Sequence, residues 1–406
     1  MASTSNSYDI IIVGGGPVGL TLAASLIRFG SGLKIAVCDR RPFTVPEDAR
    51  ASALAAGVTR VFEGLGLWED MRAAASPIAR MEITDSGQGD LARPLFLQFE
   101  GDVAPNTPYA HMVPNKVTIA TLLEAIAGKV DLLVPGEITG LETDGALARL
   151  KIAGGDDLSA PLIVAADGAR SALRDMAGIG VVGHDYDQMG IVTTISHALA
   201  HHNTAWEHFR PAGPFASLPL PGQRSSLVWT EKTEDALRYK DMSREELAPV
   251  IEAAMGSVLG TVVVDDVVQA FPLRLQIARS FVGKRLALIG DAAHVVHPIA
   301  GQGLNLGLKD VAALAEVIIE AQRLGQDMGG ADILERYERW RRFDTALMAL
   351  ATDGLNRLFS NDVAPVRAVR DLGLGLVDRL PFLKAGLIRH AAGLSDGPKL
   401  LRGQPI

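Results

Sequence analysis

The 406-residue chain has little cysteine, no surplus of basic residues and no long apolar run. Its single cysteine, Cys38, excludes an internal disulfide and a cysteine-ligated zinc or iron–sulfur cluster, and is typical of a reducing compartment. A net charge of -8 excludes a protein-wide basic surface for nucleic acid. No apolar run reaches the roughly 18 residues of a membrane-spanning helix, and the first residues lack a signal-peptide pattern. We therefore expect a cytoplasmic protein, or one bound peripherally to the inner face of the membrane.

The apolar pattern that is present divides the chain into two kinds of segment. Runs typical of strands buried on both faces of a parallel sheet lie at 8–13, 33–39, 161–168 and 285–290. Between about 183 and 275, short alternating strands separated by proline and glycine turns predict a mostly antiparallel sheet. Helices are expected over 17–30, 50–75, 114–128 and about 303–322. Pieces of one domain therefore flank a second, inserted domain.

The first motif that indicates chemistry is the string GGGPVG at 14–19, which follows a predicted strand and opens a predicted helix. It fits G-x-G-x-x-G inside a β-α-β unit, the context that makes this pattern specific for a dinucleotide. Gly14 permits a tight turn, Gly16 lets a pyrophosphate approach the backbone, and Gly19 lets the helix pack close to the strand. The helix N-terminus offers free N–H groups to the phosphates. Asp39, which ends the next strand, can bind ribose hydroxyls, so the nucleotide is NAD or the adenosine half of FAD.

Two further motifs follow predicted strands. Asp167 and Gly168 end the strand at 161–168, and because Asp-Gly is also a common turn pair, this motif alone fits both a binding site and a turn. The string GDAAHVVHPIAGQGLNLGLKD at 290–310 runs from a strand through a glycine-spaced loop into a helix. Asp291 can bind a polyol or ribose hydroxyl there. The positive end of the helix dipole suits a flavin, whose reduced ring carries negative charge.

Taken together and in this order, the three motifs resemble those of the group A flavin monooxygenases, the FAD-dependent aromatic hydroxylases. The resemblance covers nearly the whole chain, and the string at 290–310 is highly specific to that group. The strings at 49–68, 213–222 and 353–362 are similar to those of the ubiquinone-biosynthesis hydroxylase subfamily.

This resemblance implies an α/β fold. We expect a Rossmann-like FAD-binding domain with a glutathione-reductase-like βαβ unit, an inserted, mostly antiparallel β-sheet substrate domain, and a C-terminal helical segment. The FAD-binding domain is expected to be discontinuous, over 1–80, 112–182 and 275–350. The expected substrate domain covers 81–111 and 183–274, and the C-terminal segment covers 351–406.

The resemblance also assigns binding roles to the matching positions of this chain. The glycine loop would meet the FAD pyrophosphate, and Asp39, where many relatives carry glutamate, would bind the adenosine ribose. Arg50 and Asn115 would contact the flavin. Asp167 would serve both FAD and NAD(P)H, and Asp291 would bind the ribityl or ribose region. The predicted cofactor-binding residues are Gly14, Gly15, Gly16, Pro17, Val18, Gly19, Asp39, Arg40, Arg50, Asn115, Asp167, Gly290, Asp291, Pro298, Gly301, Gly303, Leu304 and Asn305.

The activity implied is that of an FAD- and NAD(P)H-dependent monooxygenase in ubiquinone biosynthesis. Such an enzyme uses O2, through a C4a-hydroperoxide of the reduced flavin, to hydroxylate the aromatic ring of a polyprenylated phenol or benzoquinol. No side chain stands out as a catalytic residue, because the cofactor carries the chemistry. We expect residues 213–220 and 271–273 to lie nearest the flavin ring.

Two alternatives differ from this activity. The same fold could hydroxylate another phenol or epoxidise an alkene, or the chain could be a non-catalytic subunit that binds flavin or lipid. The intact glycine and aspartate motifs argue against the second alternative. A basic, amphipathic stretch within 361–406 fits either a helix that lies on a membrane surface or one packed on the FAD-binding domain. Association with other copies or with a ubiquinone-biosynthesis complex is compatible with both.

No metal site is predicted. Four histidines crowd between 197 and 208, but without a carboxylate or cysteine at ligand spacing they predict a solvated loop or strand edge. His294 and His297 form H-x-x-H without the glutamate that a zinc protease requires.

Overall fold

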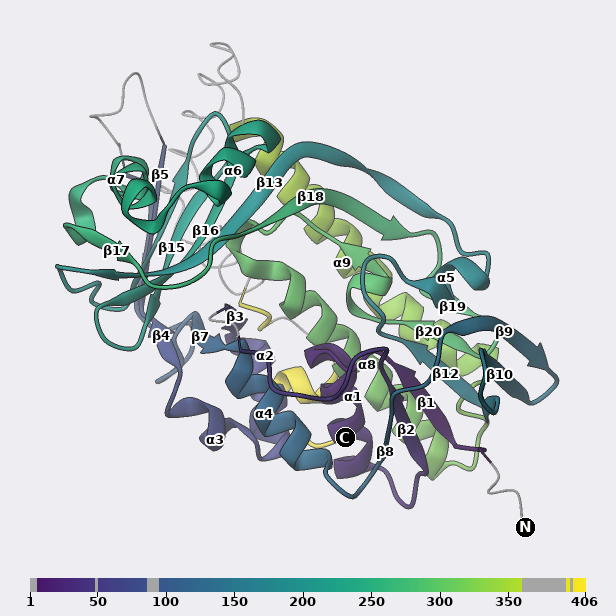
Figure 1. The fold of residues 1–406 in the computed structure, drawn as a ribbon. Helices are drawn as coiled ribbons and strands as arrows, with labels where there is room; N and C mark the ends of the chain where they lie inside the picture. Colours follow the sequence, from purple (N-terminus) through teal and green to yellow (C-terminus); the bar gives the residue numbers. More distant parts are fainter. Residues whose placement is uncertain (1–5, 48–49, 86–94, 360–391, 395–396) are drawn as a thin grey trace.

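The computed structural model describes residues 6–47, 50–85, 95–359, 392–394 and 397–406, and its two largest sheets have six and nine strands (Figure 1). The predicted α/β fold with a largely antiparallel sheet is confirmed. The domain boundaries given above stay a prediction. Most of the predicted C-terminal segment, including its basic amphipathic stretch, lies outside the described residues.

The six-stranded sheet contains the strands that the apolar runs predict. Its order is β19-β20-β12-β1-β2-β8, and every neighbouring pair is parallel except β19 and β20. All residues of β1, β2 and β12 are buried, as expected for strands covered on both faces. The strands are β1 Ile10–Val13, β2 Ile35–Cys38, β8 Asp131–Leu133, β12 Leu162–Ala165, β19 Val282–Gly283 and β20 Leu286–Leu288.

The nine-stranded sheet follows the path β21-β18-β13-β16-β15-β14-β5-β6, with β17 paired to β13. Its pairs are antiparallel, except that β14 and β5 run parallel. The short strand β21 belongs to the 290–310 motif, so that motif connects the two large sheets. The strands are β5 Arg80–Asp85, β6 Leu95–Glu100, β13 Val181–His197, β14 Thr204–Phe209, β15 Phe215–Leu220, β16 Arg224–Lys232, β17 Val262–Val264, β18 Gln269–Ala278 and β21 His294–Val295.

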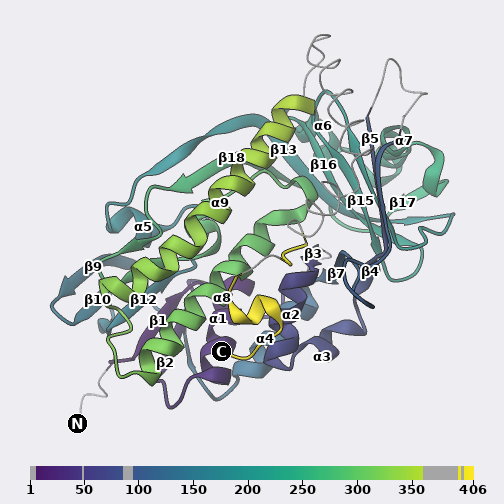
Figure 2. The ribbon, with the colours of Figure 1, turned by 180° about the vertical axis from the view of Figure 1, so that it is seen from behind.

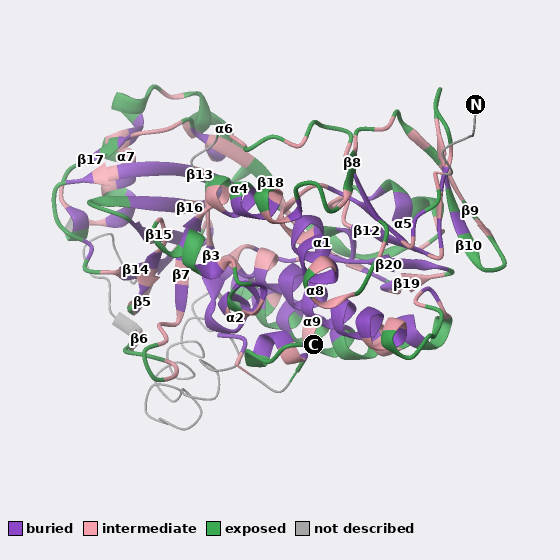
Figure 3. Cartoon of the chain, turned by 90° about the horizontal axis from the view of Figure 1, so that it is seen from below, coloured by how far each residue is buried: buried purple, intermediate pink, exposed green. Residues whose placement is uncertain are grey.

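Helix α8 is the central helix, buried along most of its length (Figure 3). It packs against α1 on one side and against α9, the long helix at the back of the molecule, on the other (Figure 2). Among the described residues, no helix is both long and apolar enough to cross a membrane. The α-helices are α1 Pro17–Phe29, α2 Ala56–Leu65, α3 Trp68–Arg72, α4 Asn115–Ile126, α5 Ala172–Met176, α6 Thr233–Asp241, α7 Arg244–Met255, α8 Gln302–Arg323 and α9 Ala331–Phe359. Short 3₁₀ turns lie at Ser257–Leu259, Gly290–Ala292, Ile299–Gly301 and Lys399–Arg402.

Two three-stranded sheets complete the fold, and one of them corrects a prediction. The helix predicted over 50–75 is wrong at its start, because 51–55 form a strand that pairs antiparallel with β7. The alanine-rich string favours a helix locally, but pairing with a distant strand outweighs that preference. The strands are β3 Ala51–Ala55, β4 Ser76–Ile78 and β7 Ala110–Pro114 in one sheet, and β9 Ile138–Asp144, β10 Leu147–Ile152 and β11 Leu158–Ala160 in the other.

Candidate active site

Three predicted site segments lie at one edge of the six-stranded sheet. Strands β12, β1 and β20 run parallel with β12 between the other two, so their carboxyl ends share that edge. Gly14 follows β1, Asp167 follows β12, and Asp291 follows β20. Ligands of open α/β sheets bind at this edge. The fold therefore assembles one candidate site from three segments that are far apart in the sequence.

The glycine loop is built so that two of its glycines are required for packing and one faces open space. Gly14 has φ +127°, and a Cβ there would lie 2.1 Å from the carbonyl oxygen of Ala166. A Cβ on Gly19 would lie 2.0 Å from the carbonyl oxygen of Gly14, so helix α1 can approach β1 only without a side chain. A Cβ on Gly16 would meet no protein atom within 4 Å. This opening beside free N–H groups of α1 is the kind of space that a pyrophosphate fills.

Asp39 holds the glycine loop from the end of β2. Its Oδ2 accepts a 2.7 Å hydrogen bond from the N–H of Gly15, and its Oδ1 accepts one of 2.9 Å from the N–H of Arg41. Both oxygens keep a lone pair, which leaves the carboxylate able to accept from a ribose hydroxyl. Arg40, also predicted to contact the cofactor, is exposed beside it.

Val18 joins the first motif to the third. Pro17 is the first residue of α1, where its fixed φ suits a helix start. Val18 then contacts the third motif, since a Cβ on Gly290 or Gly307 would lie 3.3 or 2.8 Å from its methyl groups. The start of α1 and the start of α8 are thus packed against each other around one side chain.

A buried ionic network fixes the backbone that carries Asp291. The Asp310 carboxylate accepts hydrogen bonds from the N–H of Gly290 at 2.9 Å, from Nε2 of His294 at 2.7 Å and from Nε of Arg341 at 2.7 Å. Burial alone would raise the pKa of Asp310, but the charges of His294 and Arg341 hold it below its ordinary value. Asp291, the residue after Gly290, is exposed.

Asp291 and Asp167 are carboxylates whose charged form is disfavoured by the surrounding protein. Protein atoms surrounding Asp291 desolvate its carboxylate and raise its pKa, although the residue is exposed. Burial likewise raises the pKa of Asp167, against the hydrogen bonds it receives from Ser171 and backbone N–H groups. Oδ1 of Asp167 is buried and has no hydrogen-bond partner. A bound group that donates hydrogen bonds would satisfy both side chains.

Asn305 uses its side chain to join α8 to β3. Its Oδ1 accepts from the N–H of Ala55 at 2.9 Å, and its Nδ2 donates to the carbonyl oxygens of Ala53 at 2.8 Å and Gly301 at 3.1 Å. Both polar atoms of the amide are thereby hydrogen-bonded inside the protein, and the side chain positions the loop before α8.

The loop before α8 leaves its backbone accessible. Pro298 precedes a 3₁₀ turn that ends at Gly301, whose φ of +63° lies in the left-handed region. In the first turn of α8, a Cβ on Gly303 would meet nothing within 4 Å, whereas Leu304 packs against the main core. Space thus opens on the glycine side of the loop, where the resemblance places the flavin ring.

Arg50 and Asn115 lie together where β3 begins and β7 ends. The N–H of Asn115 donates to the carbonyl oxygen of Arg50 at 2.8 Å, and Asn115 Oδ1 accepts from the hydroxyl of Ser52 at 2.8 Å. The Arg50 guanidinium lies 5.9 Å from the ring centre of Phe271, which belongs to β18 and is 42% exposed. Phe271, one of the residues predicted near the flavin, is therefore close to a second predicted site residue.

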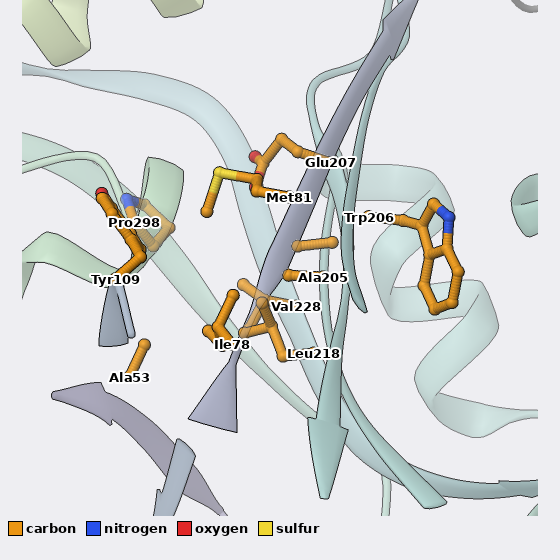
Figure 4. Close-up of a pocket in the computed structure, with 12 residues that line it drawn as sticks. Ala53, Ile78, Met81, Tyr109, Ala205, Trp206, Glu207, Leu218, Val228 and Pro298 are labelled. Atoms are coloured by element: carbon orange, nitrogen blue, oxygen red, sulfur yellow. The ribbon is translucent and has the colours of Figure 1, made fainter. Parts of the chain in front are cut away.

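A pocket lies where this loop meets the nine-stranded sheet (Figure 4). Pro298 and Gly301 of the motif and Ala53 of β3 line one part of it. The remaining lining residues are Ile78, Met81, Tyr109, Ala205, Trp206, Glu207, Ala216, Leu218 and Val228. The walls are mainly apolar, as expected where an aromatic ring binds and water is excluded.

Sequence reasoning missed three residues around the site: the charged partners Asp310 and Arg341, and the pocket residue Glu207. Asp310 stands at the end of the 290–310 motif, and Arg341 follows only on the next helix, so no local pattern joins them. Glu207 could have been found, because strand alternation places it on one face with the apolar Ala205 and Phe209. A charged residue on the buried face of a strand indicates a binding or catalytic role.

The prediction of a solvated histidine cluster is wrong for His197, His201 and His208, which are 5, 7 and 5% exposed. His197 hydrogen-bonds to the carbonyl oxygen of Leu199 and the hydroxyl of Ser225, and the other two rings also have partners within the sheet. They are core residues, because a long twisted sheet buries polar rings that find partners. Within the described residues, no group of three histidine, cysteine or acidic side chains is arranged to hold a metal ion.

Comparison with known proteins places this geometry among flavin enzymes. The model of the FAD binding domain family matches residues 7–349. The chain is 41% identical to the ubiquinone hydroxylase UbiL of Rhodospirillum rubrum, over 100% of this chain and 95% of that protein. It is 35% identical to the 3-demethoxyubiquinol 3-hydroxylase of Escherichia coli, over 96% of this chain and all of that protein. The fold is similar to p-nitrophenol 4-monooxygenase PnpA of Pseudomonas putida, with TM-score 0.78, 20% identity, and 95 and 98% of the two chains covered.

Proposed function

Because the chain belongs to the FAD binding domain family, within its group of ubiquinone hydroxylases, we propose that it hydroxylates the aromatic ring of a polyprenylated phenol or benzoquinol in ubiquinone biosynthesis. It is an FAD-dependent monooxygenase. The observation that carries the proposal is the pocket between the motif loop and the nine-stranded sheet. Its apolar walls suit an aromatic ring, and Pro298 and Gly301 open it toward the predicted flavin site.

A second hollow supports a substrate with a long tail. It shares Ile78, Met81 and Tyr109 with the first pocket and is more open to solvent. Its other lining residues are Ala79, Arg80, Phe99, Glu100, Gly101, Asp102 and Val103. Three shared residues make the hollows neighbours, so a ring in the first could extend an apolar chain into the second.

The residues of the predicted site fit FAD, and each has a separate task. The pyrophosphate would occupy the space beside Gly16. Asp39 would accept hydrogen bonds from the adenosine ribose, and Asp291 would accept one from a hydroxyl of the ribityl chain. Bound FAD, reduced by NAD(P)H, supplies the oxygen chemistry that side chains cannot perform. The protein binds the cofactor, orients the substrate ring and keeps water from it. NAD(P)H would reach the flavin without a dinucleotide domain of its own.

Removal of the Asp291 carboxylate should weaken FAD binding. D291A deletes an acceptor for a ribityl hydroxyl, and a charge-assisted hydrogen bond contributes about 1.5–3 kcal/mol, so affinity should fall about 10- to 100-fold. Fluorescence titration of the apoprotein with FAD measures the change. D291N keeps one acceptor oxygen and should lie between D291A and the wild type, whereas D156A, at an exposed position of the β10–β11 turn, should bind FAD normally. Unchanged affinity in D291A would remove this residue from the site.

The proposed function is tested in the organism that makes the protein. Deletion of the gene should lower ubiquinone and lead to accumulation of a polyprenylated precursor lacking one ring hydroxyl, measured by mass spectrometry of extracted quinones. A plasmid copy should restore ubiquinone, and a copy with the FAD-binding variant D291A should restore less. Normal ubiquinone with no accumulated precursor would favour the hydroxylation of another phenol or an alkene.

A further inference from the structure

Glu207 is a buried carboxylate that the fold itself does not use. It lies in β14 and is 6% exposed, and strand alternation directs it to the same face as Ala205, into the pocket. Figure 4 shows its carboxylate on the side of Met81 and turned toward the wall that Tyr109 and Pro298 form, while Trp206 points the opposite way. Among the described residues, Glu207 has no hydrogen-bond or ion-pair partner for its carboxylate.

A second buried glutamate of the same sheet shows what a structural role requires. Glu231 on β16 is 4% exposed, and its Oε1 accepts hydrogen bonds from Arg210 Nη1 at 2.6 Å and Trp229 Nε1 at 2.8 Å. Burying an unpaired carboxylate costs several kcal/mol, so proteins normally supply such partners. Glu207 lacks them and faces a pocket. The missing partner is therefore expected to come from whatever binds in that pocket.

The groups around Glu207 define the chemistry of this partner. The other pocket walls are apolar apart from Tyr109, the hydroxyl of which lies near enough for the two groups to interact electrostatically. Burial and the charge of Glu207 raise the pKa of Tyr109 to about 12, so this phenol stays protonated and can donate a hydrogen bond. An acceptor and a donor thus face the same space, and a ring hydroxyl can use both.

We propose that Glu207 is the base that accepts the proton of the substrate's ring hydroxyl during hydroxylation. This inference rests on the proposed function, since it requires a phenol or quinol in the pocket. The O–H bond breaks, its electron pair stays on the ring oxygen, and the proton moves to the carboxylate. The negative charge delocalised into the ring makes the attacked carbon more nucleophilic toward the electrophilic oxygen that the cofactor supplies. That carbon then loses its hydrogen as a proton to solvent, and the C–H electron pair makes the ring aromatic again. The negative charge returns to the ring oxygen, to which Glu207 gives back its proton.

The acidity of Glu207 is suited to this role. Burial raises its pKa from 4.5 to about 7, close to the pH of the cytoplasm, where a general base works best. A glutamate with an ordinary pKa would be too weak a base to deprotonate a phenol efficiently. Tyr109 would hold the ring oxygen by donating a hydrogen bond to it, which also stabilises the phenolate.

The first test compares E207Q with the wild type as FAD-loaded enzymes, acting on a short-chain polyprenylated phenol. Glutamine has the same shape but cannot accept the proton, so kcat should fall about 10²- to 10⁴-fold. The rise in kcat with pH near 7 should disappear in the variant, while its FAD absorbance stays normal. The control E82Q removes one charge on the neighbouring strand, where Glu82 accepts from Trp206 Nε1 without lining the pocket itself, and should keep the wild-type pH profile.

Two further measurements do not depend on turnover. The probe 4-nitrophenol changes its absorbance on ionisation, and the wild type should bind it as phenolate at a pH where E207Q binds it as phenol. Thermal unfolding of the apoprotein gives the second measurement. The pKa of Glu207 is higher in the folded than in the unfolded protein, so this residue favours folding at low pH and opposes folding as the pH rises. E207Q should therefore gain stability over the wild type between about pH 4.5 and 7.

Each outcome decides between the two proposals. Wild-type kcat and pH profile in E207Q, with 4-nitrophenol ionised equally in both, would overturn the role of Glu207. A wild type that hydroxylates no polyprenylated phenol but ionises 4-nitrophenol through Glu207 would overturn the substrate and keep the base. If E207Q does not fold, E207D decides, since it keeps a carboxylate and should retain a pH-dependent rate. A folded, active E207D whose rate does not change with pH would refute the assignment.

Discussion

Replacement of Gly14 by alanine should leave the protein without FAD and lower its free energy of unfolding by about 3 kcal/mol or more. The backbone at Gly14 has φ +127°, which an L-residue rarely adopts, and the new Cβ would lie 2.1 Å from the carbonyl oxygen of Ala166. Ala166 directly follows β12 and Gly14 directly follows β1, so relief of the clash must move the ends of these two buried strands. Chemical denaturation of the apoprotein and FAD absorbance of the purified protein measure the two effects.

The matched variant G16A separates the fold from the cofactor. Gly16 has φ -80° and ψ 177°, which any residue adopts, and its added Cβ would meet no protein atom within 4 Å. The apoprotein should therefore unfold like the wild type, while the methyl group occupies the space expected for the pyrophosphate and FAD affinity falls. Normal FAD binding in G16A would mean that the phosphates lie elsewhere. A stable G14A protein would show that β1 and β12 can separate at low cost.

Removal of the carboxylate of Asp310 should destabilise the protein by about 3–5 kcal/mol. D310A leaves Arg341 and His294 buried without their shared partner and frees the N–H of Gly290. Because Gly290 carries the neighbouring Asp291, FAD affinity should also fall although Asp310 lies beneath the site. Urea unfolding of the apoprotein and FAD titration measure the two losses separately. The control D344N changes a less buried member of the network, 19% exposed at its side chain, and should cost less.

The same network predicts a difference in acid sensitivity. The folded pKa of Asp310 lies below its ordinary value of 3.8, so its stabilising contribution is present above that value. It is lost as pH falls through the lowered folded pKa. The stability difference between the wild type and D310N should therefore shrink as the pH is lowered below 3.8. A difference independent of pH would show that the two proteins differ through packing rather than charge.

Local patterns predicted the parts of the fold that depend on local physics. The apolar runs became β1, β2, β12 and β20, and the glycine spacing predicted a tight turn at which both Gly14 and Gly19 indeed leave no room for a side chain. The prediction failed at 51–55, where an alanine-rich string with helical preference pairs as a strand with residues 110–114. A pattern within a few neighbouring residues cannot show pairing with a strand that lies so far along the chain.

In the candidate site, too, local patterns predicted some features and contacts between distant segments decided others. The aspartates that follow buried strands, Asp39, Asp167 and Asp291, were recognisable because each ends a strand at the binding edge of a parallel sheet. The histidines between 197 and 208 were misjudged as solvated, because their burial depends on hydrogen-bond partners in other strands. Asn305 was predicted as a cofactor contact, and the structure shows that its side chain is occupied by β3 and Gly301.

By itself, the sequence determined the dinucleotide turn, the parallel strands, and through its motifs a family that uses FAD. These features follow from local patterns in the sequence, such as the glycine spacing, the continuous apolar runs and a carboxylate at a strand end. Only the tertiary structure decided that Glu207 faces Tyr109 and Pro298 across one pocket, and that Asp310 joins His294 to Arg341. The side chains in each group come from different elements, and only their burial together shifts the pKa values of Glu207, Tyr109 and Asp310.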